Sequence, residues 1–90
     1  IYLYAQAFVE YAKSVDIDET VARDLFAKSL IGSAKMITDS GKSLDELIEM
    51  VSSKGGTTIA GLEKLREGGL PKAVEECCKA CTKRAYELSK

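Results

Sequence analysis

The amino-acid sequence predicts an all-α domain built from five helices. Apolar side chains recur at helical spacing along most of the 90 residues, and no stretch alternates apolar and polar residues as a half-buried strand would. The single proline, Pro71, falls at a junction between two predicted segments and interrupts neither of them. A chain of this length forms one domain at most, and its own core gives only marginal stability.

The first two helices are predicted at about residues 1–14 and 19–39. The first presents one apolar face, made of Ile1, Ala5, Phe8, Val9 and Ala12. Asp18 is a favourable N-cap for the second, and Glu19 suits the positive end of the helix dipole in its first turn. Gly41 marks the point near which the second helix ends.

The remaining three helices are predicted after Ser43, at residues 57–67, and from Pro71 onward. Ser43 and Glu46 form a capping box, in which each side chain bonds the backbone N–H of the other residue. The apolar face behind this cap consists of Leu44, Leu47, Ile48 and Val51. The fourth helix ends at Gly68 and Gly69, and Pro71 fits the first turn of the fifth, where its missing N–H costs nothing.

The second helix predicts a partner subunit. From Leu25 to Ile37 it is apolar or small nearly all round, with Lys28 and Lys35 on one narrow polar stripe. The four shorter helices of the chain can hardly cover such a helix, whereas a second chain can. Each Å² of apolar surface that the second chain buries stabilises the association by about 25 cal/mol. We therefore expect an intertwined homodimer, with a higher oligomer also open. The alternative is a compact monomer with a well-filled core.

Composition and charge exclude several partner classes. The 13 basic and 14 acidic side chains give a net charge of −1, and no block of one sign predicts a nucleic-acid surface or a membrane-binding helix. The segment 25–37 falls short of a membrane span. With no signal peptide visible, we expect a cytoplasmic location, and the start at Ile1 suggests a piece of a longer protein.

The three cysteines predict packing, not metal chemistry. Cys77, Cys78 and Cys81 are an odd number for a disulfide framework, so reduced thiols are expected. Cys78 and Cys81 have Cys-x-x-Cys spacing, but no second pair and no histidine completes a tetrahedral zinc site. Since all three share an apolar helical stripe with Val74 and Leu88, we expect them in the core. A redox or metal site remains the alternative.

The segment from Ser52 to Leu62 predicts an anion site. Gly55 and Gly56 allow backbone conformations that other residues avoid, and a helix follows them directly. The first turn of a helix has unpaired N–H groups that can hold a carboxylate. Hydroxyl groups of Ser52, Ser53, Thr57 and Thr58 would add donors. The simpler alternative is an N-cap after a flexible turn.

The segment from residue 44 to 65 resembles the signature of pyrroline-5-carboxylate reductases, in which Ser-Pro-Gly-Gly-Thr-Thr is typical. The matching positions are Leu47, Val51, Ser52, Ser53, Gly55, Gly56, Thr57, Thr58, Ile59, Gly61 and Leu62. Residues 30–36 and 82–88 are similar to two further helices of the family, so that the resemblance covers nearly the whole chain. Lys54 departs from the pattern, because the family usually has proline there.

This resemblance implies that residues 1–90 are the C-terminal dimerisation and substrate-binding domain. The family's Rossmann domain, which binds NADPH or NADH and reduces 1-pyrroline-5-carboxylate to L-proline, is absent from this chain, as is any Gly-x-Gly-x-x-Gly motif. These 90 residues alone are expected to be inactive. A free-standing helical interaction module without catalysis is the alternative function.

The resemblance also assigns roles to residues of the glycine loop. The backbone N–H groups of Gly56, Thr57 and Thr58 would hold the substrate carboxylate, and Ser53 would help to shape the loop. Ser53 and Gly55 are counted with these three as substrate-binding residues. Thr58 is the candidate catalytic residue, because its position lies close to the substrate's ring nitrogen in the family. The chain itself is expected to hold neither cofactor nor metal.

Overall fold

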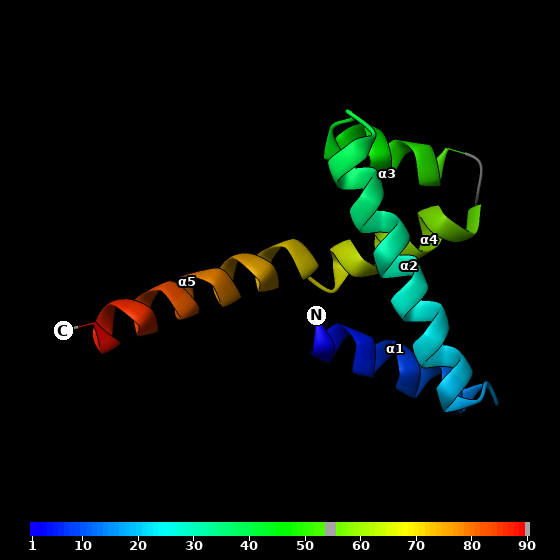
Figure 1. Cartoon of the computed structure of the whole chain (residues 1–90), viewed down its shortest axis with the longest axis horizontal. Helices are drawn as coiled ribbons and strands as arrows, with labels where there is room; N and C mark the ends of the chain where they lie inside the picture. Colours follow the sequence, from blue (N-terminus) through cyan, green and yellow to red (C-terminus); the bar gives the residue numbers. More distant parts are fainter. Residues whose placement is uncertain (54–55, 90) are drawn as a thin grey trace. The chain divides into compact units, whose positions relative to one another are not determined.

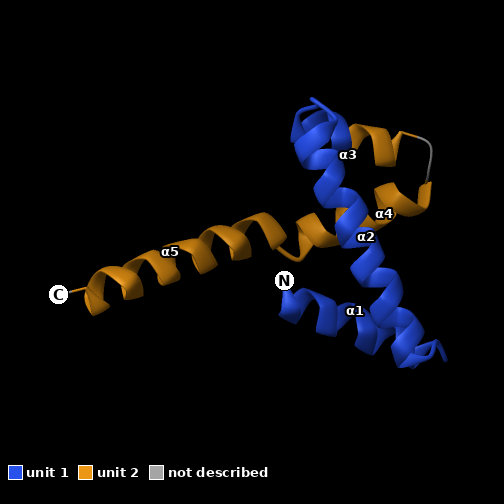
Figure 2. Ribbon diagram, viewed as in Figure 1, with its two compact units in different colours: residues 1–47 blue, residues 48–90 orange. Residues whose placement is uncertain are grey.

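The structure, a computed structural model, describes residues 1–53 and 56–89. The five predicted helices are present, in the order α1 (Tyr2–Ser14), α2 (Glu19–Asp39), α3 (Leu44–Ser52), α4 (Gly56–Glu67) and α5 (Leu70–Leu88) (Figure 1). The described residues contain no strand, so the all-α prediction is confirmed. The chain divides into two units, residues 1–47 and 48–90, with the boundary inside α3 (Figure 2). The predicted intertwining concerns a second chain and stays a prediction.

The first unit is organised around a hairpin of α1 and α2. Val9 and Ala12 of α1 and Ala22 of α2 are the buried apolar residues among those described. Next to them, the ring of Phe26 contacts two rings of α1, with centroid distances of 5.6 Å to Tyr4 and 5.3 Å to Phe8. The predicted face of α1 therefore packs as expected from Phe8 to Ala12, whereas Ile1 at its start is exposed.

The turn between α1 and α2 closes through a Schellman motif. The N–H of Ile17 donates to the carbonyl of Ala12 at 2.9 Å, and the N–H of Asp16 donates to that of Lys13 at 3.1 Å. Asp16 takes the left-handed conformation that this motif requires, with φ of 65°. Aspartate tolerates this region better than most side chains. The turn directs α2 back along the apolar face of α1.

Both predicted N-caps in the first unit are confirmed. The carboxylate of Asp18 accepts hydrogen bonds from the N–H groups of Thr20 and Val21, at 3.0 and 3.3 Å. At the start of α3, the N–H of Ser43 donates to Glu46 Oε1 at 2.9 Å, and the N–H of Glu46 donates to Ser43 Oγ at 3.1 Å. The Ser43 N–H, and after it the Ser43 hydroxyl, hold the pKa of Glu46 below its ordinary value, because both stabilise the carboxylate form.

The second unit contains α4 and α5, which meet at a glycine turn. Gly69, with φ of 81°, follows α4 and caps α5, and its N–H donates to the Arg66 carbonyl at 3.0 Å. Pro71 lies in the first turn of α5, as predicted. The polar face of α5 carries exposed ion pairs, among them Lys79–Glu75 at 3.0 Å and Lys72–Glu76 at 3.2 Å.

The prediction that the cysteines pack in the core is wrong for the chain by itself. Cys77, Cys78 and Cys81 are all exposed. Val74 and Leu88 on the same stripe are exposed as well. The physical reason is that the described residues of the chain do not bury the apolar stripe of α5, although its spacing is that of a core-facing helix.

Candidate functional site

The predicted anion site lies between the end of α3 and the start of α4. Ser53 directly follows α3, and Gly56, Thr57 and Thr58 form the first turn of α4. The helix therefore begins one residue earlier than predicted, because Gly56 is helical and does not belong to the loop. Gly55, which was predicted to bind substrate, and Lys54 lie outside the described residues.

The first turn of α4 has the properties of an anion-binding helix end. Its leading N–H groups have no partner four residues earlier within the helix, and the dipoles of twelve residues add at this end. The first turn carries no acidic side chain, whereas Lys64 and Arg66 lie in the last turn, where positive charge is favourable. The charge distribution of α4 is therefore favourable for an anion at its start, and no carboxylate of its own first turn competes for the N–H groups.

Two of the four predicted hydroxyl donors are already used at the end of α3. The hydroxyl of Ser52 donates to the carbonyl of Ile48 at 2.8 Å, and that of Ser53 donates to the carbonyl of Met50 at 3.4 Å. The Ser53 bond satisfies a carbonyl in the last turn of α3, where a helix leaves such groups unpaired, and the Ser52 bond is an additional one to a carbonyl one turn back in the same helix. In this structure both hydroxyls thus bond the helix that precedes the site, and their role toward a ligand stays a prediction.

The two threonines differ in their surroundings. Thr57 is exposed, whereas Thr58 is half-buried together with Leu62, which lies one turn further along the same face of α4. Burial and branching at Cβ both restrict the rotation of the Thr58 side chain. Thr58 is therefore the better placed of the two to hold a hydroxyl in one direction.

Two hollows among the described residues are lined by helices other than α4. A shallow groove of about 200 Å³ lies in the hairpin of the first unit, where Val9 and Ala5 of α1 face Phe26 and Leu30 of α2. A larger hollow of about 660 Å³ is lined by residues of α5 only, from Glu75 to Glu87. A single helix cannot enclose a ligand, so this hollow is an open surface and not a pocket.

The described part of the chain offers little for cofactors or metals. Within residues 1–53 and 56–89, no group of three or more His, Cys, Asp and Glu side chains is arranged to hold a metal ion. No helix in those ranges has the length and the apolar character to span a membrane. The same ranges contain no strand followed by a glycine-rich loop, so they do not form the usual dinucleotide site.

One interaction on α5 was missed at the level of sequence. Cys77 lies one helical turn before Cys81, and its proximity raises the pKa of the Cys81 thiol. The spacing of four residues between these two cysteines was the available signal in the sequence. Cys81 therefore stays protonated at neutral pH.

Comparisons with known proteins agree with the resemblance drawn from the sequence. The family described as pyrroline-5-carboxylate reductase dimerisation matches residues 1–88. A pyrroline-5-carboxylate reductase 3 of Danio rerio is 35% identical over 88 residues, which are 98% of this chain and 31% of the relative. Pyrroline-5-carboxylate reductase 2 of Bacillus subtilis (strain 168) is 32% identical, again over 98% of this chain and 32% of the relative.

A third relative, pyrroline-5-carboxylate reductase 3 of Macaca fascicularis, is 37% identical over 97% of this chain and 32% of its own length. The chain thus spans about a third of the length of the curated relatives it matches. No significant match to a solved structure was found. The match to the family covers all five helices. The chain therefore belongs to the pyrroline-5-carboxylate reductase dimerisation family.

Proposed function

We propose that this chain is the self-associating, substrate-orienting part of a reductase that converts 1-pyrroline-5-carboxylate to L-proline. The family match over residues 1–88 and the names of the relatives support this assignment. The relatives are about three times as long, which leaves room for a separate domain that binds NADPH or NADH. The cofactor would supply the hydride, and the residues of this chain would bind and orient the acid.

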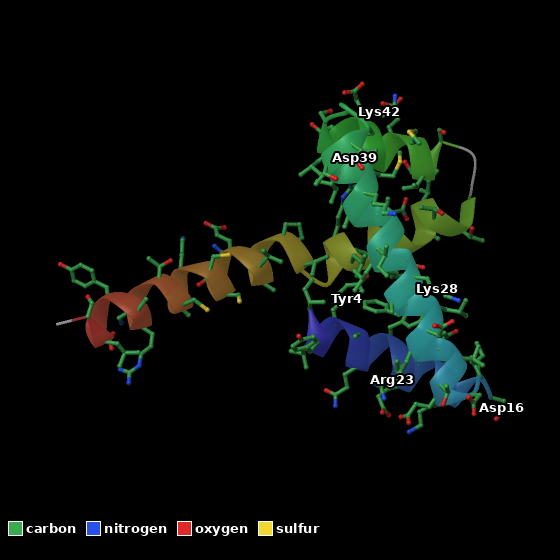
Figure 3. The ribbon with its side chains drawn as sticks, viewed as in Figure 1. Tyr4, Asp16, Arg23, Lys28, Asp39 and Lys42 are labelled. Carbon is green, nitrogen blue, oxygen red and sulfur yellow. The ribbon has the colours of Figure 1, made fainter. Side chains whose placement is uncertain are left out.

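Self-association is supported by the surface that the single chain leaves exposed. We call Val21, Leu25, Ser29, Gly32 and Met36 the second face of α2, because their spacing of three and four residues places them on one stripe. Lys28 borders this stripe, three residues after Leu25 and four before Gly32, and Figure 3 shows it on the side of α2 away from Tyr4. Val21 and Leu25 are about half exposed, and a Cβ atom at Gly32 would meet no atom of this chain. An apolar stripe with the small residue Gly32 near its centre allows the backbone of a second copy to approach closely.

We assign carboxylate binding to the start of α4. The single observation that supports this assignment is the composition of the first turn of that helix. Gly56, Thr57 and Thr58 provide consecutive N–H groups, and no acidic side chain opposes an anion there. Gly56 has no side chain to block the approach of a ligand, and the space around its Cβ position is open. Such a helix end binds a carboxylate through its backbone and its dipole.

Thr58 would position the reacting ring. Addition of a hydride to the carbon of the C=N bond requires a proton at the ring nitrogen, and a hydroxyl of half-buried Thr58 is held near the carboxylate-binding turn. Threonine is too weak an acid to supply this proton by itself, so water or prior protonation of the imine must provide it. The contribution of Thr58 is then mainly orientation, which removes part of the entropic barrier.

The test is an NMR titration of ¹⁵N-labelled chain with L-proline, the product that carries the same carboxylate. We expect the amide signals of Gly56, Thr57 and Thr58 to shift together with one dissociation constant. Pyrrolidine, which has the ring but no carboxylate, serves as the matched ligand control and should leave them unmoved. The start of α5 is an internal control, because Pro71 removes one of its N–H groups.

The variant Thr58→Val keeps the shape of the side chain and removes its hydroxyl. We expect it to bind L-proline with the same shifts at Gly56 and Thr57 but to lose catalytic rate in the complete reductase. If L-proline shifts amides elsewhere and leaves α4 unchanged, the carboxylate assignment is wrong. If no proline binding occurs while the chain still self-associates, the chain acts as an interaction module, the alternative function considered from the sequence.

A further inference from the structure

The fifth helix has an apolar stripe that its own chain leaves uncovered. Among the described residues, α5 contacts α4 and no other helix, although it extends over 19 residues from Leu70 to Leu88. Val74 is 53% exposed and Leu88 is 68% exposed, and the three cysteines between them are exposed as well. A helix with one uncovered apolar stripe is marginal in water, so this stripe requires a covering surface.

The stripe has the spacing of a helix that pairs lengthwise with another helix. Its residues lie alternately four and three positions apart, as in the contact line of two paired helices. We call them the α5 seam: Leu70, Val74, Cys77, Cys81, Arg84 and Leu88. The positions that flank the seam are small, namely Ala73 and Ala80 on one side and Cys78 and Ala85 on the other. Small side chains at the contact let two helix axes approach closely.

The order of residues in the seam fits a second copy of the same helix. Residue 79 is the midpoint of α5, so two antiparallel copies aligned there overlap along their whole length. In this register, seam residues equally far before and after residue 79 lie opposite each other. Leu70 of one chain then faces Leu88 of the other at both ends, and Cys77 faces Cys81 near the centre.

Arg84 is the one charged residue of the seam. In the same register it lies opposite Val74 of the second copy. Its guanidinium group bonds the carboxylate of Glu87 in its own chain at 3.2 Å, and both side chains are exposed. The aliphatic stem of an arginine can cover an apolar side chain while its charge stays in water. The arginine is therefore compatible with pairing at this position.

The charges of α5 favour the antiparallel over the parallel direction. The half before residue 79 carries one net negative charge, from Lys72, Glu75 and Glu76. The half after it carries one net positive charge, from Lys83, Arg84 and Glu87. Antiparallel pairing brings opposite halves and opposite dipole ends together, whereas parallel pairing brings like halves together. Such exposed contacts are individually weak, so they select the direction and the seam supplies the association.

We propose that α5 pairs with α5 of a second copy in antiparallel orientation, with Cys77 of each chain beside Cys81 of the other. The family description as a dimerisation domain supports a second copy as the occupant, and a two-fold dimer uses the same patch on both subunits. The inference rests on the self-association in the proposed function and names one surface for it. This surface is distinct from the second face of α2, because α2 and α5 belong to different units of the chain.

The experiment determines which cysteines of two copies form a disulfide. One chain keeps only Cys77, through Cys78→Ser and Cys81→Ser, and the other keeps only Cys81, through Cys77→Ser and Cys78→Ser. Diamide oxidises each chain alone and an equimolar mixture, and it takes up the two thiol hydrogens as each S–S bond forms. Cross-linked dimer is measured on non-reducing gels.

We expect the mixture to cross-link at least about 10-fold faster than either chain alone. In the proposed register, unlike cysteines lie at the same height, whereas like cysteines are displaced by four residues, or about 6 Å along the helices, which exceeds the Cβ separation of a disulfide. The control is a chain with all three cysteines replaced by serine and with Lys79→Cys, which lies at the midpoint but on the opposite side of α5 from the seam. It should not cross-link above the background of random collision.

A second measurement uses the chain with its other residues intact. Cys77→Glu places a charge in the seam and should raise the dissociation constant in sedimentation equilibrium at least about 10-fold, because burying an unpaired charge is costly. Lys79→Gln, on the outer side, should change it only a few-fold. Equal effects of the two substitutions would overturn the proposal.

The cross-linking outcomes separate the alternatives. Chains that cross-link with themselves as fast as the mixture would indicate parallel pairing and would overturn the proposed register. Dimers in sedimentation without cross-linking in the mixture would reject the α5 contact and leave self-association through α2 intact. A parent chain that is monomeric at all concentrations would overturn both, whereas carboxylate binding at α4 is measured independently by the titration with L-proline.

Discussion

Replacing Leu25 by alanine tests the proposed role of α2 in self-association. Leu25 lies at the middle of the second face of α2 and is 53% exposed in the chain. Leucine and alanine both favour helices, so the substitution leaves α2 itself nearly as stable. The change therefore removes apolar surface available to a partner, with little effect on the hairpin formed by Ala22 and Val9.

The expected magnitude follows from the exposed fraction. Complete burial of a leucine side chain is worth about 1.5–3 kcal/mol, and about half of this remains available at Leu25. A two-fold dimer contains the position twice, so the substitution should cost about 1.5–3 kcal/mol of association free energy. The dissociation constant should then rise about 10- to 150-fold.

Sedimentation equilibrium over a range of concentrations measures this constant directly. Lys28→Ala is the matched control on the same helix, because its ion pair with Asp24, at 2.9 Å, is exposed and worth about 0–1 kcal/mol. It should change the dissociation constant only a few-fold. A Leu25→Ala chain that dimerises as tightly as the parent, with unchanged helicity, would refute the assignment of this face to the interface.

The remaining predictions concern the fold of the single chain. Ser43→Ala should lower the stability of α3 by about 0.5–2 kcal/mol in urea unfolding, because it removes the N-cap hydroxyl, and an unchanged stability would contradict the capping box. The pKa of Glu46, measured by NMR titration of the carboxylate, should rise only in part, because the N–H of residue 43, the larger cause of the lowered pKa, remains. Because the folded pKa is lowered, the stability that Glu46 contributes is present above its unfolded pKa and is lost as the pH falls through the folded pKa. Ala22→Leu should destabilise the α1–α2 hairpin by about 1–3 kcal/mol in urea unfolding, because Ala22 is 1% exposed and a larger side chain does not fit there. Ala34→Leu, at an exposed position of the same helix, is the control and should not lower the stability. Equal effects of the two substitutions would contradict the described core. Gly69→Ala should lower the free energy of unfolding by about 1–2 kcal/mol, because φ of 81° at this position disfavours any residue with a Cβ atom. A smaller loss in urea unfolding would argue against the described turn.

The helix ends could be predicted from the sequence because their causes are local. Asp18 caps the two N–H groups that lie two and three residues later, and Ser43 with Glu46 closes a four-residue ring of hydrogen bonds. Gly69 and Pro71 act within one turn of their own positions. None of these interactions depends on the packing of distant residues, so one short stretch of sequence contains all the information required.

The parts that could not be predicted depend on what covers each surface. The end of α1 relies on Asp16 in a conformation that glycine usually takes, so no glycine signals the turn. The apolar stripe of α5 has the spacing of a core-facing helix, and yet it is exposed in this chain. Periodicity predicts that such a face is covered, but it does not predict whether the same chain or a second chain covers it. Likewise, the hydroxyls of Ser52 and Ser53 were competent to bind a ligand but bond the end of α3 instead.

The small core and the proposed site both depend on how few apolar side chains this chain buries by itself. Val9, Ala12 and Ala22 are buried among the described residues, whereas Leu25, Ile37 and Val74 remain about half exposed. Local capping and hydrogen bonding are sufficient to define each helix, but short isolated helices are marginal in water and need tertiary packing to persist. A second copy that covers these faces would supply that packing, and the stability of the fold would then depend on the concentration of the chain. Anything that strengthens the association would also hold α4 in its helical form, so that assembly would itself order the turn proposed to bind the carboxylate.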